Sequence, residues 1–74
     1  MKTYVEILHS TEGEKVSQIF EKMKNLGFKP ALGEHDFVFL WKKNVVLSEV
    51  IKFLDIVVSK LKGTGAILKF TTIR

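Results

Sequence analysis

Phe37-Val38-Phe39-Leu40-Trp41 is an uninterrupted apolar stretch, rich in aromatic and branched residues, and it predicts a β-strand. A strand in a sheet that is covered on one face normally alternates between apolar and polar residues, because only one face meets the core. Here neither face carries a polar side chain. One row is therefore expected to point away from the core. The pattern leaves open whether this row is Phe37, Phe39 and Trp41 or Val38 and Leu40.

Two more strands are predicted on the N-terminal side of this stretch. Residues 3–9 alternate, with Val5 and Ile7 on one face and polar or mixed residues on the other. Residues 28–32 form a shorter strand that contains Pro30. Because proline has no backbone N–H to donate to a neighbouring strand, this strand is expected at the edge of the sheet.

A helix is predicted between these two strands, over residues 12–26. Thr11 and Glu14 have the spacing of a capping box, with Ser10 as the alternative N-cap, and Gly27 is expected to end the helix. The helix has an apolar stripe at helical spacing, formed by Val16, Ile19, Phe20, Met23 and Leu26.

A second helix is predicted after the aromatic stretch, with Ser48 or Asn44 as its cap. Its apolar stripe consists of Leu47, Val50, Ile51, Leu54, Val57, Val58 and Leu61. Phe53 and Ile56 fall outside this stripe. Residues 66–73 then alternate as a last strand, with Leu68 and Phe70 on one face.

The order of these elements is β-α-β-β-α-β, with the strands at 3–9, 28–32, 37–42 and 66–73. Right-handed crossovers and a central hairpin predict an α+β fold of two layers, in which both helices cover one face of a four-stranded antiparallel sheet. With the strands numbered along the chain, their spatial order is 4-1-3-2, which places Pro30 on an outer strand. The pattern resembles the ferredoxin-like plait over residues 1–74, a single domain. This superfold hosts many unrelated functions.

The composition sets a few limits on compartment and partners. The net charge of +4 favours polyanions at low salt. The absence of cysteine fits a reducing, cytoplasmic environment. No stretch approaches the roughly 20 apolar residues of a transmembrane helix, and the N-terminus does not resemble a signal peptide, so we expect no membrane contact. Side-chain amides are few, which is typical of thermophile proteins.

Two segments resemble parts of RNA-recognition motifs. Thr3-Tyr4-Val5-Glu6-Ile7-Leu8 is similar to the first-strand hexamer of that family, and Asp36-Phe37-Val38-Phe39-Leu40 is similar to part of its third-strand octamer. In that family such aromatic residues stack on unpaired bases. The resemblance implies a stacking platform made of Tyr4, Phe37 and Phe39, to which Trp41 can be added.

One end of the predicted sheet is basic. The starts of the strands at 3–9 and 28–32 and the ends of the other two strands meet there. The candidate phosphate or anion contacts are Lys2, Lys29, Lys42, Lys43 and Arg74. The alternative interpretation is that these cations keep the strand ends solvated and discourage edge pairing.

The opposite end of the sheet is expected to hold His9 and His35, near Ser10, Thr11, Glu34 and Asp36. Histidines with carboxylates can bind zinc or copper, but no spaced ligand motif is present, so we expect solvated turn residues and no metal or cofactor. A nucleophile beside a histidine–carboxylate pair is also missing from the sequence pattern, and an enzyme is the last-ranked hypothesis.

The sequence does not determine a biochemical function. The preferred hypothesis is a non-enzymatic interaction module, in which an apolar sheet face with Tyr4, Phe37, Phe39 and Trp41 is buried in a homodimer or against a protein partner. The alternative is a module that binds single-stranded nucleic acid, such as RNA, through the same face and the basic end.

Overall fold

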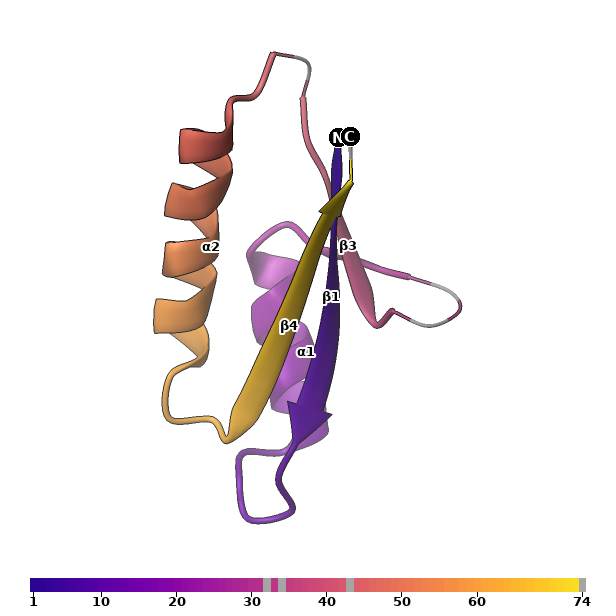
Figure 1. The fold of residues 1–74 in the computed structure, drawn as a ribbon. Helices are drawn as coiled ribbons and strands as arrows, with labels where there is room; N and C mark the ends of the chain where they lie inside the picture. Colours follow the sequence, from indigo (N-terminus) through magenta and orange to yellow (C-terminus); the bar gives the residue numbers. More distant parts are fainter. Residues whose placement is uncertain (32, 34, 43, 74) are drawn as a thin grey trace.

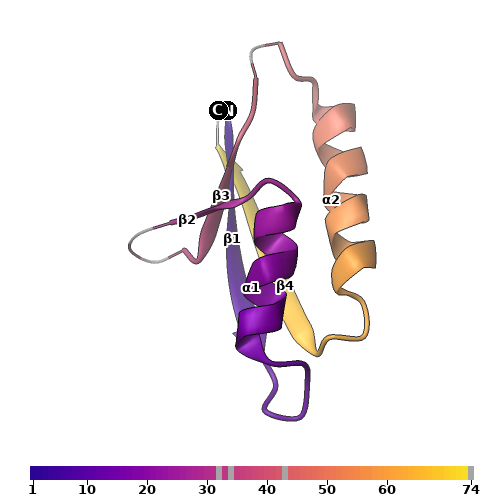
Figure 2. The ribbon, with the colours of Figure 1, turned by 180° about the vertical axis from the view of Figure 1, so that it is seen from behind.

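The computed structural model describes residues 1–31, 33, 35–42 and 44–73. They form a two-layer α+β fold with the predicted order of elements (Figure 1). The elements are β1 (Lys2–His9), α1 (Val16–Asn25), β2 (Lys29–Pro30), β3 (Phe37–Leu40), α2 (Leu47–Leu61) and β4 (Ala66–Ile73). Both helices lie on the same side of the sheet (Figure 2). The ferredoxin-like architecture expected from the sequence is therefore confirmed.

The four strands are antiparallel to their neighbours and follow the order β2-β3-β1-β4. This is the predicted order 4-1-3-2 counted from the opposite edge. The edge strand β2 contains Pro30, as expected, although it is only two residues long. Lys2 pairs with Ile73, so β1 begins and β4 ends at the same end of the sheet.

The pairing of β1 answers the question that the aromatic stretch left open. Val5 lies opposite Phe37 on β3 and opposite Phe70 on β4. Directly paired residues of an antiparallel sheet point to the same face. Val5 and Phe37 are both fully buried in the helix-facing core, so the alternation of β3 directs Phe37 and Phe39 toward the helices and Val38 and Leu40 outward.

The core lies between the sheet and the two helices. Its buried cluster consists of Val5, Ile19, Met23, Phe28, Phe37, Val57 and Leu61. A group of rings continues this core toward the end of β3. Phe39 packs on Phe53 of α2 with 4.5 Å between ring centroids, and Trp41 lies 4.7 Å from Phe39. Aromatic pairs at these separations attract each other beyond their burial alone.

The N-cap of α1 differs from the prediction, whereas Gly27 follows the end of this helix in the expected left-handed conformation, with a φ of 100°. α1 begins at Val16, four residues later than expected, and no described side chain caps it. The Ser10 hydroxyl instead accepts the Glu12 N–H at 3.2 Å, within the turn that precedes the helix. A short polar side chain that bonds inside a turn is not available as a cap.

The cap of α2 was also predicted wrongly. Val46 occupies the N-cap position, and no capping hydrogen bond from Ser48 or Asn44 is found in the described part of the chain. Asn44 has a φ of 68°, a left-handed conformation that turns the chain before the helix begins.

Candidate interaction surfaces

The four aromatic residues predicted for a binding face do not lie on one face. Tyr4 is on the outer face of the sheet, because it pairs with Val38 and Thr71, and its side chain is half-buried. Phe37 and Phe39 point toward the helices, and Trp41 packs against Phe39 and Phe53. Three of the four aromatic residues therefore lie on the helix-facing side, and only Tyr4 lies on the outer face where the resemblance implied a stacking platform.

A hydrogen bond holds Trp41 in the helix-facing layer. Its indole Nε1–H donates to the hydroxyl of Thr3 at 2.8 Å, and the hydroxyls of Thr3 and Thr72 are 2.9 Å apart. Thr3 is fully buried, so this hydroxyl has exchanged its water partners for these two groups. Buried polar groups that are satisfied in this way fix the orientation of their partners.

We expect Thr3→Val to lower the free energy of unfolding by about 1 kcal/mol, because the Trp41 indole and the Thr72 hydroxyl lose a partner while the shape is kept. Urea denaturation followed by Trp41 fluorescence measures the change. Thr71→Val is the matched control, since Thr71 lies exposed on the outer face of the same sheet. Equal stability of the two variants would show that the hydroxyl network contributes nothing.

The outer face of the sheet is polar in its middle and apolar at its ends. The Tyr4 ring stacks on His35 with 4.6 Å between centroids. The Glu6 carboxylate lies 3.4 Å from His35 Nδ1 and 3.8 Å from Lys69 Nζ. Exposed aliphatic residues flank this group, with Leu8 opposite Ile67 at one end and with Leu40 and Ile73 on either side of Lys2 at the other.

The structure describes three of the five basic residues that were predicted for an anion site. Lys2 is exposed on the outer face of β1, and Lys42 is exposed just after β3 at the same end of the sheet. Lys29 is exposed on the edge strand β2, opposite Val38. Lys43 and Arg74 lie outside the described residues. The three described lysines thus come from three different strands or strand ends.

The two histidines lie on opposite faces of the sheet. His9 pairs with Ala66, which lines the helix-facing side, whereas His35 packs on Tyr4 and Glu6 of the outer face. His9 Nδ1 is buried and lacks a hydrogen-bond partner in the described structure. No group of three or more His, Cys, Asp or Glu residues that could hold a metal ion occurs among the residues described. Glu34, predicted for the same end, falls outside the described ranges.

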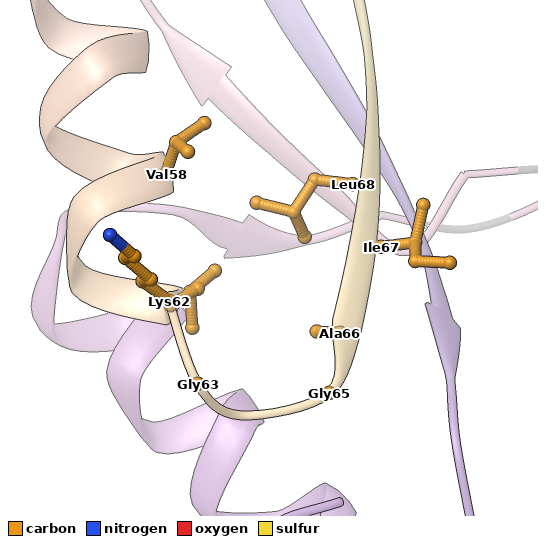
Figure 3. Close-up of a pocket in the computed structure, with 8 residues that line it drawn as sticks. Val58, Lys62, Gly63, Gly65, Ala66, Ile67 and Leu68 are labelled. Carbon is orange, nitrogen blue, oxygen red and sulfur yellow. The ribbon is translucent and has the colours of Figure 1, made fainter.

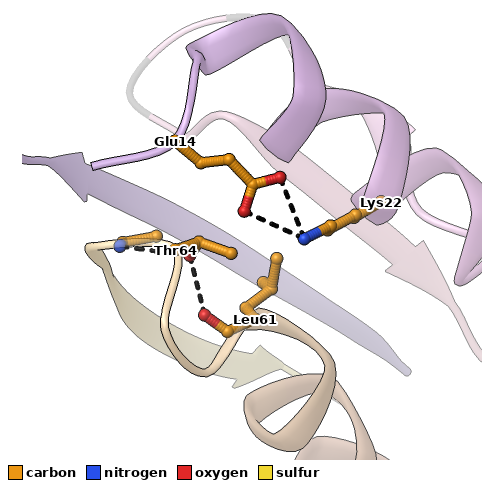
Figure 4. Close-up of polar contacts among 5 residues, drawn as sticks. Glu14, Lys22, Leu61 and Thr64 are labelled. Carbon is orange, nitrogen blue, oxygen red and sulfur yellow. Dashed lines mark hydrogen bonds and ion pairs between the residues drawn. The ribbon is translucent and has the colours of Figure 1, made fainter.

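The loop before α1 packs on the loop between α2 and β4. The backbone N–H of Glu14 donates to the carbonyl oxygen of Thr64 at 2.9 Å. The Glu14 carboxylate forms an ion pair with Lys22 at 3.0 Å, and the Thr64 hydroxyl donates to the Leu61 carbonyl at 2.7 Å (Figure 4). These contacts hold the two loops together at the end of the sheet where β1 ends and β4 begins.

The apolar surface that the sequence did not identify lies on α2. The predicted stripe divides into two parts: Val50, Val57 and Leu61 are buried, whereas Leu47, Ile51 and Val58 are 61%, 51% and 51% exposed. Spacings of four and seven residues place the exposed members on one side of a helix with 3.6 residues per turn. Together with the half-buried Leu54 between them, we call these residues the α2 stripe: Leu47, Ile51, Leu54 and Val58.

The α2 stripe is turned away from α1 and toward the edge of the sheet. Lys60 lines a hollow together with residues of α1, which marks the side of α2 that faces the other helix. Val58 is two residues from Lys60, so it lies on nearly the opposite side. Val58 and Leu68 of β4 line one open groove, and Figure 3 shows them pointing toward each other while Ile67 points to the other face of the strand.

The edge next to this stripe is the free side of β4. β4 pairs with β1 along all eight of its residues, and no described strand pairs with its other side. The edge strand β2, in contrast, is short and contains Pro30, two of the devices by which proteins protect sheet edges. β4 is eight residues long and contains no proline, and Lys69 is its one charged residue over Ala66–Ile73, so it presents a long outer row of backbone N–H and C=O groups.

Comparison with protein-family models, with curated proteins and with solved structures found no match. None of the described helices has the length and the apolar composition needed to cross a membrane.

Proposed function

We propose that this chain is a non-enzymatic interaction module, which binds a protein through the α2 stripe and the free edge of β4. The observation that carries this proposal is the position of Leu47, Ile51 and Val58, which are more than half exposed on the side of α2 next to an unpaired strand. Each buried aliphatic side chain stabilises a complex by about 1.5–3 kcal/mol before the entropic cost of association. Burial of the stripe therefore favours a complex.

The chemistry of the surface favours a polypeptide as the partner. A row of backbone N–H and C=O groups at the spacing of a β-strand is matched by another β-strand, which forms main-chain hydrogen bonds along its whole length. The neighbouring side chains are aliphatic, and they match the apolar face of a helix or strand. One partner element can thus satisfy the edge while another covers the α2 stripe.

A nucleic acid is supported less well by the same geometry. Phe37 and Phe39 face the helices, so they offer no ring to a base on the outer face. Tyr4 is stacked on His35, and the carboxylate of Glu6 lies next to the same imidazole. A carboxylate at this position repels the phosphate backbone that dominates nucleic-acid affinity.

The chain contains a matched pair of residues for testing the α2 stripe. Ile51 and Ile56 are 51% and 52% exposed on the same helix. Ile56 lies four residues before Lys60, on the side toward α1, whereas Ile51 belongs to the α2 stripe. We expect the tagged chain to capture a protein from a cell extract, and an untagged copy of the same chain counts as such a protein. The captured protein is expected to be lost with Ile51→Lys and retained with Ile56→Lys.

Quantitative capture with the wild-type chain and the two variants gives the measurement, and circular dichroism confirms that all three are folded. A charge placed in an apolar contact is expected to reduce retention at least tenfold. Identical retention by Ile51→Lys and the wild-type chain would contradict the proposed surface.

A further inference from the structure

We propose that the partner is a second copy of this chain, whose β4 pairs antiparallel with β4 in a register centred on Phe70. This inference rests on the proposed function, because it names the partner of the same surface. It places Ile67 opposite Ile73 of the second copy and Lys69 opposite Thr71 of the second copy. The two sheets then continue as one, with β1 next to β4 on either side of the junction.

The symmetry of such a pair follows from the position of the α2 stripe. A two-fold axis perpendicular to the sheet keeps the helices of both copies on the same face. The α2 stripe faces the β4 edge, so this axis brings the two stripes toward each other above the junction. An axis within the plane of the sheet would place the helices on opposite faces and leave both stripes in water.

This symmetry limits the registers that β4 can adopt. Directly opposite residues in an antiparallel pair point to the same face, so an inward residue such as Phe70 must face an inward residue of the second copy. The axis therefore passes through a residue and not between two residues. Over Ala66–Ile73, only axes through Lys69 or Phe70 pair seven residues of each strand, and other choices pair fewer.

Charge decides between the two long registers. An axis through Lys69 places the Lys69 side chains of the two copies directly opposite each other, and like charges in such pairs are destabilising. An axis through Phe70 places Lys69 opposite the uncharged Thr71. It also pairs the rings of Phe70 and places the exposed Ile67 beside the exposed Ile73 of the second copy.

The same register covers the apolar ends of the outer face. Leu8 already lies opposite Ile67 within one chain, and Ile73 of the second copy extends this row across the junction. Leu8 and Ile67 are 69% and 66% exposed in the single chain. In the joined sheet these three aliphatic side chains lie side by side and cover one another. They therefore expose less apolar surface than they do on two separate chains.

Single cysteines test the register, because the described chain has none of its own. Ile67→Cys and Ile73→Cys, mixed and oxidised, are expected to form a disulfide-linked dimer, since opposite residues lie within disulfide reach. Each variant alone is expected to form none, because its two copies are separated by six residues along the strand, about 20 Å. Ile67→Cys mixed with Thr71→Cys is also expected to form none, because these two positions are opposite each other only in the register centred on Lys69, and this pair leaves Lys69 in place. All three positions are exposed, and circular dichroism checks that the variants fold.

Sedimentation of the purified chain separates this inference from the proposed function. A dimer that Ile51→Lys dissociates and Ile56→Lys does not, with the Ile67–Ile73 cross-link, is the expected result. A monomer at high micromolar concentration, with Ile51-dependent capture of a different protein, overturns the second copy and leaves the proposed function standing. A cross-link between Ile67→Cys and Thr71→Cys, the pair that is opposite in the register centred on Lys69, overturns the register. A monomer without Ile51-dependent capture overturns both.

Discussion

Phe37→Ala is expected to lower the free energy of unfolding by about 3–5 kcal/mol, which is the usual cost of removing a buried phenylalanine side chain. Phe37 is fully buried at the centre of the core cluster, and its ring contacts that of Phe20 edge-to-face at 4.8 Å. A domain of this size is stable by about 5–10 kcal/mol. The substitution therefore removes a large part of the stability, and some of the chains are expected to unfold at room temperature.

Val38→Ala is the matched control for this prediction, because Val38 is the next residue on the same strand and points to the outer face. Its expected cost is about 1 kcal/mol or less, since it is only half-buried and loses two methyl groups. Urea denaturation followed by circular dichroism compares the two variants. A larger loss for Val38→Ala than for Phe37→Ala would mean that β3 presents its other face to the helices.

The same pair of residues shows why the fold was predictable and the binding face was not. The order of elements, the edge position of Pro30 and the antiparallel sheet all follow from local patterns and from the handedness of crossovers. The orientation of β3 depends on its register with Val5 of β1, a contact between distant parts of the chain. Where both faces of a strand are apolar, alternation carries no information about that register.

The rotation of α2 about its axis was also not predictable from the sequence. Helical spacing predicted the helix itself, but not its rotation about its axis. Phe53, which falls outside the predicted stripe, packs against Phe28, Phe39 and Trp41, and its position among these rings turns Ile51 and Val58 toward the edge of the sheet. The signal in the sequence was the width of the apolar stripe. Seven aliphatic residues with Phe53 beside them cover more of the helix than one sheet face can bury.

The start of α1 was predicted wrongly because the residues before it contact the loop between α2 and β4. Thr11 and Glu14 have the spacing of a capping box, but the Glu14 carboxylate pairs with Lys22 and its backbone N–H donates to Thr64. Thr64 is 50 residues further along the chain, so no local pattern reveals this contact. A motif that is favourable in an isolated helix is thus displaced by a tertiary contact between loops.

Gly13→Ala is expected to destabilise the chain by about 2–3 kcal/mol through the same loop contact, because overpacking and a lost backbone hydrogen bond act together. A Cβ atom at this position would lie 2.4 Å from the carbonyl oxygen of Thr64 and 3.2 Å from Cα of Gly65. Both are backbone atoms, which cannot rotate away. The two loops must therefore separate, and the hydrogen bond from the Glu14 N–H to Thr64 lengthens or breaks.

Lys22→Gln separates this backbone effect from the neighbouring ion pair. It removes the partner of the Glu14 carboxylate and leaves the contact of Gly13 with Thr64 unchanged. Both charged side chains are about one-third exposed or more, so the expected cost is below about 1 kcal/mol. Urea denaturation ranks the two variants, and amide hydrogen exchange at Glu14 reports on the loop contact directly. If Gly13→Ala keeps wild-type stability and slow exchange at Glu14, the two loops are not in the close contact that accounts for the late start of α1.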